Sequence, residues 1–120
     1  MLSIRLQQVL EYISSNDRLA DIGCDHGYLT IGAIEKGVRF VQLIDNKEGP
    51  LTIAKKNLKQ FENMAQVIYT HADGLANLDN LVNVVCICGM GGDLIYNIIN
   101  DNLVTVSYTH LRAHETRSNL

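Results

Sequence analysis

The chain has 120 residues with a formal net charge of −3, and 47% of its residues are hydrophobic and 19% charged. This balance is typical of one globular domain with its own core and excludes a disordered chain. No apolar run reaches the roughly 18 residues of a membrane helix, and the N-terminus lacks the basic and apolar parts of a signal peptide. We therefore expect neither a membrane span nor secretion.

The cysteines and the charge narrow the class further. Cys24, Cys86 and Cys88 are an odd number, and they can build neither a disulfide framework nor a four-cysteine zinc site. We expect a cytoplasmic protein without a metal. Because the net charge is negative, it gives no general attraction to nucleic acid, so any nucleic-acid partner has to be recognised at a local site.

The first part of the chain predicts a helix, a strand and a second helix. Apolar residues spaced three or four apart predict an amphipathic helix over residues 3–14. A short buried strand over residues 19–22 then ends at Gly23, where a glycine-rich loop begins. Helix-forming residues follow over 28–35, and Gly37 is typical of a left-handed helix end.

The alternation continues in the second part. We expect strands over residues 40–44, 66–69 and 81–88, and a helix over 51–61 whose first turn accepts Pro50. The strand over 81–88 is an almost unbroken apolar run. Such a run is typical of a central strand in a parallel sheet that helices cover on both faces.

We expect a last helix over residues 94–99, capped by Asp93. The element order predicts an α/β fold with a doubly wound parallel sheet, of which the chain supplies four strands before its composition changes. The sheet is then truncated after the fourth parallel strand. We expect an open edge beside that strand, and hence poor solubility and weak or no catalysis by the chain as written.

The helix over residues 51–61 has two different faces. Its predicted inner face consists of Ile53, Ala54, Leu58 and Phe61. The outer face carries Lys55, Lys56 and Lys59. These lysines either form a solvated surface or contact nucleic-acid phosphates.

The glycine-rich loop carries the first chemical signal. Residues 21–29 are DIGCDHGYL, at the edge where open α/β sheets bind ligands. The spacing of Gly23 and Gly27 differs from the G-x-G-x-x-G of dinucleotide loops, and Asp25 would repel a phosphate. A ligand with a cationic or zwitterionic end fits better, because Asp21 and Asp25 attract a sulfonium or ammonium group. S-adenosylmethionine is such a ligand.

Two more acids follow the next two strands. Asp45 stands where a carboxylate can accept both hydroxyls of a ribose, and Asp73 could accept from an adenine amino group. Each acid alone also has an ordinary structural interpretation: Asp21 holds loop amides, Asp45 caps a helix and Asp73 closes a turn. Three acids at three successive strand ends favour a ligand site.

Four segments carry a family resemblance: DIGCDHGYL at 21–29, GPLTIAKKN at 49–57, DGL at 73–75 and GMGG at 89–92. In combination they resemble the bacterial tRNA (adenine-22-N1)-methyltransferase family. The resemblance covers residues 2–104. Thr30 stands where this family commonly has proline, and Cys24 where threonine is usual.

The resemblance implies a Rossmann-like class I methyltransferase fold that uses S-adenosylmethionine to methylate N1 of adenine 22 in tRNA. It implies no metal and no covalent intermediate, and it assigns no catalytic residue. The implied cofactor contacts are Asp21, Gly23, Cys24, Asp25, His26, Gly27 and Tyr28, then Asp45 and Asn46 at the ribose, and Asp73 and Gly74 at the adenine. The implied substrate-side loop is Gly89, Met90, Gly91 and Gly92.

His26 and the three cysteines need separate interpretations. His26 either handles a proton or positions a ligand, or it is a hydrogen-bonded structural residue of the loop. Cys86 and Cys88 share one face of a buried strand, where we expect them to pack in the core. Cys24 is then the one thiol expected near a ligand.

The sequence changes character at Val106. Residues 106–116 are VSYTHLRAHET, which has no period and resembles one translated frame of a common transposase sequencing adapter. We expect residues 1–105 to be the N-terminal part of a methyltransferase domain and 106–120 to be a non-native tail. The alternatives to a tRNA methyltransferase are a non-catalytic cofactor-binding module, an inactive fragment, or a methyltransferase with another substrate.

Overall fold

The computed structural model describes residues 4–74, 77–88, 94–98 and 104–107. In chain order its elements are α1 (Ile4–Leu10), β1 (Arg18–Ile22), α2 (Tyr28–Lys36), β2 (Phe40–Asp45), α3 (Glu48–Leu58), the 3-10 helix η1 (Lys59–Phe61), β3 (Gln66–His71), β4 (Val84–Cys88), β5 (Leu94–Ile98) and β6 (Val104–Ser107). None of the helices within these residues is long and apolar enough to cross a membrane.

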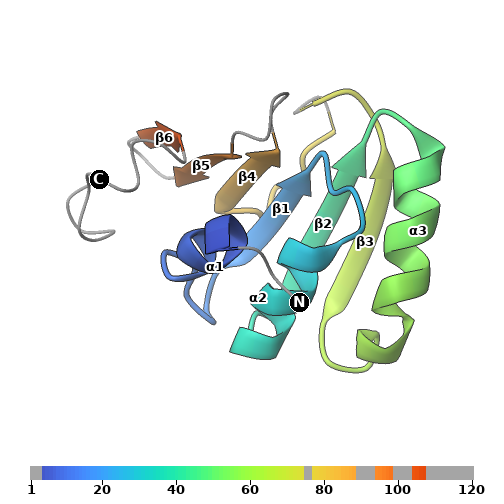
Figure 1. The fold of residues 1–120 in the computed structure, drawn as a ribbon, viewed down its shortest axis with the longest axis horizontal. Coiled ribbons are helices and arrows are strands. Elements are labelled where there is room, and N and C mark those ends of the chain that lie inside the picture. The colour runs from blue at the N-terminus through green and yellow to red at the C-terminus, as the bar shows by residue number, and fades with distance from the viewer. Residues whose placement is uncertain (1–3, 75–76, 89–93, 99–103, 108–120) are drawn as a thin grey trace.

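The strands form one sheet in the order β3-β2-β1-β4-β5-β6 (Figure 1). The first four are parallel, with β1 between β2 and β4, and β5 and β6 are antiparallel to their neighbours. The four predicted parallel strands and the Rossmann-like order are confirmed. Because these strands are parallel, their carboxyl ends meet at one edge of the sheet.

The three α-helices pack on the same face of the sheet. One buried cluster joins Val9, Ile13, Leu29, Ala33, Ile34, Leu51, Ala54 and Leu58 to the strand residues Leu19, Val41, Leu43, Val84 and Cys86. Side chains alternate along a strand, so Asp21 shares the helix-covered face with Leu19. For the described part of the chain, the prediction that helices cover both faces of β4 is wrong, because no helix residue belongs to the cluster on the opposite face.

That opposite face is covered in part by the segment between β3 and β4. Its cluster joins Ala20, Ile22, Phe40, Ile44 and Val85 to Val82, with Ile68, Ala72, Leu78 and Ile87 packed against it. The buried Gln42 side chain fastens this segment. Its amide nitrogen donates to Thr70 Oγ1 and to the Asn77 carbonyl at 2.9 Å each, and its oxygen accepts from the Asp79 N–H at 2.8 Å. A buried amide with three partners holds the segment against the sheet without an unsatisfied polar group.

Several predicted boundaries move by a few residues. The first helix ends at Leu10 rather than at residue 14, because the N–H groups of Tyr12 and Ile13 bond three residues back, which tightens the last turn. The third helix begins at Glu48, and the fourth strand begins at Val84 rather than at residue 81.

The predicted inner face of α3 is partly wrong. Leu51, Ala54 and Leu58 are buried, three and four residues apart, and they form the stripe that packs on the sheet. Ile53 lies off this stripe and is 42% exposed. Phe61 packs against the core from η1, so the other part of the prediction is confirmed.

The predicted helix over residues 94–99 is also wrong, because residues 94–98 form the strand β5. β5 pairs antiparallel with β4 from Cys88↔Leu94 to Val84↔Ile98. Ile and Tyr favour strands, and the pairing satisfies the backbone groups along β4. The predicted open edge beside the fourth strand is therefore covered. Asp93, the expected cap, lies outside the described residues, and β6 crosses position 105, where we expect the methyltransferase part to end.

Gly27, which precedes α2, lies close to α3, and its substitution tests how closely the two helices pack. Its φ is +81°, and a Cβ there would lie 3.2 Å from the Ala54 Cβ of α3. Gly74 has a similar φ of +59° but open space around it, so it isolates the backbone contribution. We expect Gly74→Ala to cost about 1 to 2 kcal/mol from the left-handed backbone alone. Gly27→Ala adds overpacking of about 1 to 3 kcal/mol, measurable by urea unfolding. Equal losses in the two variants would show that α2 and α3 do not approach this closely.

Candidate functional site

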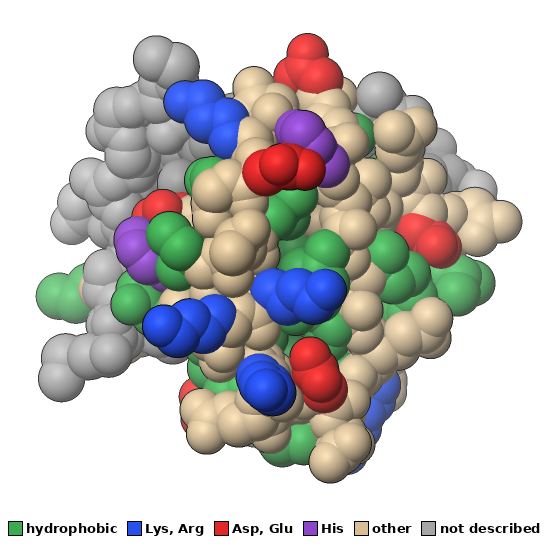
Figure 2. All heavy atoms as spheres, turned by 90° about the vertical axis from the view of Figure 1, so that its right-hand side faces the viewer, with side chains coloured by type: hydrophobic (Ala, Val, Ile, Leu, Met, Phe, Trp, Pro, Cys, Tyr) green, Lys and Arg blue, Asp and Glu red, His purple; other side chains and the backbone are tan. Residues whose placement is uncertain are grey.

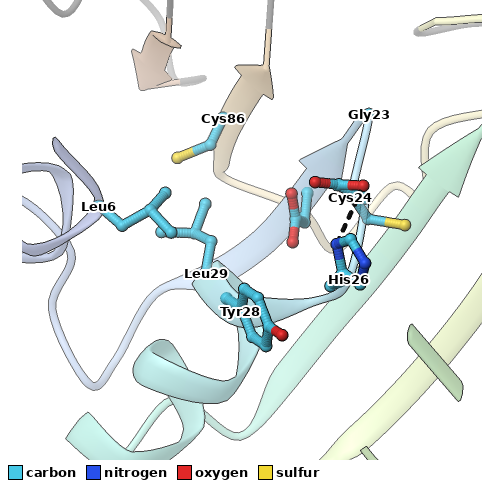
Figure 3. Close-up of a pocket in the computed structure, with 9 residues that line it drawn as sticks. Leu6, Gly23, Cys24, His26, Tyr28, Leu29 and Cys86 are labelled. Carbon is cyan, nitrogen blue, oxygen red and sulfur yellow. Dashed lines mark ion pairs between the residues drawn. The ribbon is translucent and has the colours of Figure 1, made fainter. Parts of the chain in front are cut away.

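A hollow of about 400 Å³ lies at the carboxyl end of β1, open to solvent on one side. It is lined by Leu6, Asp21, Gly23, Cys24, Asp25, His26, Tyr28, Leu29 and Cys86. In Figure 3, Leu6, Leu29 and Cys86 lie on one side of the hollow, and Cys24 and His26 on the other. Six of these nine residues are in the predicted cofactor set. The hollow thus combines an apolar wall with an acidic and polar wall.

The loop between β1 and α2 turns sharply. Gly23, Asp25 and Gly27 have φ values of 71°, 53° and 81°. The turn is closed by the Gly27 N–H, which donates to the Cys24 carbonyl at 2.8 Å. Asp is one of the few residues that adopts a left-handed conformation without a large penalty. The short side chain of Asp25 therefore reaches the mouth of the hollow from a position where most residues would be strained.

His26 belongs to a small cluster on the rim of the hollow. Its Nδ1 lies 3.1 Å from Asp25 Oδ1, and its ring stacks on Tyr28 with 5.4 Å between the ring centroids. Its carbonyl accepts a 2.9 Å hydrogen bond from the Asn57 side chain of α3. The position of the His26 ring is thus fixed by Asp25 and Tyr28, and that of its carbonyl by Asn57. These contacts are compatible with a structural role and also present the imidazole to a ligand, so both predictions for His26 stay open.

Asp21 is the buried acid of the site. Only 3% of it is exposed, and its Oδ2 accepts a 2.7 Å hydrogen bond from the Thr30 hydroxyl. Burial raises the pKa of its carboxyl to about 7, and the charges of Asp45 and Asp25 add to this, while the hydrogen bonds from Thr30 oppose it. Asp21 is therefore an acid that is half ionised near neutral pH and that gains from a cation in the hollow.

Asp45 lies at the end of β2, half-buried, and does not line the hollow. Its Oδ1 accepts a 3.0 Å hydrogen bond from the Lys47 N–H, the local turn contact of its ordinary structural role. Its charge nevertheless raises the pKa values of Asp21 and Cys24, so it acts on the same site. Asp45 thus has both a structural contact and an electrostatic link to the hollow.

The segment after β3 joins the same edge. The Ala72 N–H donates to the Asp45 carbonyl at 3.0 Å, and Asp73 and Gly74 follow directly, neither of them lining the hollow. The side chain of His71 was not predicted: its Nε2 lies 2.9 Å from the Asn46 carbonyl. The side chain of Asn46 itself is exposed.

The two described thiols are buried and belong to the hollow's lining. Burial raises the pKa of Cys24 to about 12 and the pKa of Cys86 well above its ordinary value. Both are therefore protonated at neutral pH and serve as apolar lining rather than as nucleophiles. Cys86 lies beside Asp21 in the register of β1 and β4 and lines the hollow together with Cys24. That Cys24 is the one thiol near a ligand stays a prediction.

The sequence pattern missed Leu6, Leu29 and Cys86 as lining residues, because their spacing marks them only as core. The predicted substrate-side residues Gly89, Met90, Gly91 and Gly92 lie outside the described residues, as does the side chain of Cys88. Among the residues that the structure describes, no group of three or more His, Cys, Asp or Glu is arranged to hold a metal ion.

Known proteins with related sequences are methyltransferases. A family model described as "Methyltransferase domain" matches residues 2–115. The tRNA (adenine(22)-N(1))-methyltransferase of Bacillus subtilis is 34% identical over 103 residues, which are 82% of this chain and 42% of that protein. The ribosomal protein L11 methyltransferase of Thermotoga neapolitana is 32% identical over 75 residues, which are 62% of this chain and 28% of that protein.

Solved structures give the same class. TrmK of M. capricolum, in complex with S-adenosyl-homocysteine, has a TM-score of 0.66 and 36% identity, covering 74% of this chain and 42% of that one. Sp1610 of Streptococcus pneumoniae, in complex with S-adenosyl-L-methionine, has a TM-score of 0.67 and 34% identity, covering 76% and 44%. The chain spans less than half of the length of these relatives.

A parallel sheet with a hollow at the carboxyl end of its first strand defines a Rossmann-like α/β protein with a ligand site. Since the family model matches almost the whole sequence, the chain belongs to the methyltransferase domain family.

Asp21→Asn tests the buried acid. Because the pKa of Asp21 is raised to about 7, the folded state holds a proton that the unfolded chain releases near its ordinary value of 3.8. Wild-type stability therefore falls between about pH 4 and pH 7, and this loss is absent in the variant. We expect Asp21→Asn to be more stable than wild type by about 2 to 4 kcal/mol at pH 8 and by little at pH 4.

The measurement is urea unfolding at both pH values, with Glu35→Gln on the exposed side of α2 as the control. A stability difference that does not depend on pH would contradict the assignment of a buried, titrating carboxyl to Asp21.

Proposed function

We propose that the chain carries the S-adenosylmethionine site of a methyltransferase that acts on N1 of an adenine in tRNA. The observation that carries this proposal is the hollow at the end of β1, where Asp21 and Asp25 stand opposite the apolar wall of Leu6, Leu29 and Cys86. The B. subtilis relative and the two solved structures with bound cofactor or product support it.

The residues present fit this ligand. S-adenosylmethionine supplies an electrophilic methyl group on a sulfonium, and its methionine end carries an ammonium. The described site offers carboxylates to these cationic groups, and Asp21, whose pKa burial raises, becomes more ionised when a cation enters. The loop glycines Gly23 and Gly27 let the backbone come close to a ligand.

We assign the predicted residues by the strand that each follows. The methionine end lies against Asp21, Gly23, Cys24, Asp25, His26, Gly27 and Tyr28. The ribose lies against Asp45 and Asn46, the adenine against Asp73 and Gly74, and the target base against Gly89, Met90, Gly91 and Gly92. The backbone bond between the ends of β2 and β3 supports a ligand that spans these strand ends in this order.

The chemistry asks little of side chains. N1 of adenine has a lone pair and no proton to lose, so it attacks the methyl carbon as the carbon–sulfur bond breaks, leaving S-adenosylhomocysteine and a methylated base. No residue has to act as a base, and the protein contributes mainly by aligning the two reactants. N1 is hidden in folded tRNA by pairing or tertiary contacts, so binding has to expose it.

The face around α3 is a candidate surface for RNA phosphates. Lys55, Lys56 and Lys59 are exposed there, and the Lys55 ammonium lies 5.7 Å from the centre of the Tyr69 ring. On the face drawn in Figure 2, however, acidic side chains lie beside the basic ones. A solvated helix face is therefore the better interpretation of these lysines, and contact with RNA phosphates is the alternative. A tRNA substrate also favours a cytoplasmic location.

A second candidate function is methylation of a different substrate. The T. neapolitana relative acts, by its name, on ribosomal protein L11, and it aligns over the part of this chain that would hold the cofactor. Methyltransferases that share a cofactor site but act on different substrates would align in this way. Nucleoside analysis of tRNA and mass analysis of ribosomal protein after incubation with labelled cofactor distinguish the two substrates. A non-catalytic cofactor-binding module would label neither.

Asp45→Ala tests the ribose assignment. We expect the whole protein that the source gene encodes to bind S-adenosylmethionine, and the variant to bind about 1 to 3 kcal/mol more weakly because ribose hydrogen bonds are lost. Calorimetry measures both, and Glu62→Ala, an exposed acid beyond η1, is the control. Unchanged affinity in Asp45→Ala would remove Asp45 from the site.

We also propose that residues 106–120 are not part of the native protein. We expect unamplified genomic DNA to depart from the present sequence after codon 105 and to continue the reading frame into further helices and strands. Confirmation of these codons followed by a stop would favour the non-catalytic or inactive alternative.

A further inference from the structure

Among the residues that the structure describes, Thr30 is the one whose side chain donates a hydrogen bond to the side chain of Asp21, the buried acid of the hollow. Its side chain is fully buried, and its hydroxyl donates to Asp21 Oδ2 at 2.7 Å. Thr30 lies in the first turn of α2, and Asp21 lies near the end of β1. The hydrogen bond therefore joins the two elements that the glycine-rich loop connects. A buried hydroxyl aimed at a buried carboxylate fixes the direction of that carboxylate.

The same residue uses its backbone on the same acid. The residue before α2 is Gly27, which has no side chain to cap the helix, and Thr30 is the third residue of the helix. A capping side chain ordinarily accepts the N–H of the second or third helical residue. The backbone N–H of Thr30, like its hydroxyl, favours the ionised form of Asp21 and so lowers the pKa of that carboxyl. An anion at a helix N-terminus is further favoured by the helix dipole.

The other charged groups around Asp21 oppose its ionisation. Asp45 at the end of β2 and Asp25 in the loop repel its charge, and burial disfavours it. The thiols that face the same side, Cys24 from the loop and Cys86 from β4, are protonated and bring no positive charge. Within the described residues, the two groups that favour the ionised form of Asp21 both belong to Thr30.

We propose that Thr30 is a positioning residue of the ligand site, which occupies Oδ2 of Asp21, leaves Oδ1 to a cationic group of the ligand, and makes ligand affinity rise with pH through the neutral range. The proposal rests on the proposed function, since it takes the cationic group to be that of S-adenosylmethionine. Protonated Asp21 offers the cation no charge, so binding is weak in acid. As the pH rises and Asp21 ionises, binding strengthens.

The test compares Thr30→Val, which keeps the shape and removes the hydroxyl, with Thr30→Ser, which keeps the hydroxyl. Thr52→Val in α3 is the matched control, because the Thr52 hydroxyl donates only to the Glu48 carbonyl at 3.0 Å on the exposed side of the helix. The affinity for S-adenosylmethionine is measured by calorimetry from pH 6 to pH 9 on the whole protein that the source gene encodes. Circular dichroism melting confirms that each variant is folded.

We expect wild-type affinity to rise about tenfold between pH 6 and pH 8. In Thr30→Val the rise moves up by about one pH unit, so that the variant binds roughly fivefold more weakly at pH 7 and about as tightly as wild type at pH 9. Thr30→Ser and Thr52→Val keep the wild-type profile. Should Thr30→Val not fold, Thr30→Ala gives the same measurement.

A folded Thr30→Val with the wild-type pH profile would overturn the role of Thr30 and leave the proposed function intact. A loss of affinity that is equal at every pH, or that serine does not restore, would also overturn it, because it would show a packing role only. A folded wild-type protein that binds no S-adenosylmethionine at any pH would overturn both proposals.

Discussion

The site depends on a carboxylate that is almost fully buried at the base of the hollow. Asp21 ends the strand with parallel neighbours on both sides, and 3% of it is exposed. Burying an acid in this way costs stability unless hydrogen bonds compensate the lost hydration. Thr30 provides that compensation from α2. The junction between strand and helix is therefore also the place where the protein holds a charge ready for a ligand.

The parallel register of the strands places further residues beside Asp21. Because β2 and β4 run beside β1 in the same direction, Leu43 and Cys86 lie level with Asp21, and Asp45 comes two residues after Leu43. The helices cover the face on which Asp21 points, while Gln42 fastens a connecting segment to the other face. The loops lie at the edge between these two layers, where Asp21 lines the hollow and Asp45 acts on it through its charge.

The parts of this arrangement that depend on neighbouring residues could be predicted from the sequence. The glycines that flank α2 and the acids after each strand are local signals, and the structure has them where the pattern predicts. Contacts between distant residues could not be predicted in the same way. Residues 94–98 became a strand because β4 offers a partner, and Cys86 joined the hollow because register places it beside Asp21. Thr30 gave no signal of its own, since threonine in a helix has no fixed partner.

The site also shows why a binding loop is built from residues that weaken the fold. Asp25 adopts a left-handed backbone, and Asp45 repels the buried charge of Asp21. Each is unfavourable in the free protein, and a cation between the acids relieves the repulsion. Binding of a cation would therefore be favoured by the loss of this repulsion. In the proposed site, the acids that destabilise the unliganded chain are the ones that would attract the cation of the ligand, and Thr30 decides how much of that repulsion the free protein can tolerate at neutral pH.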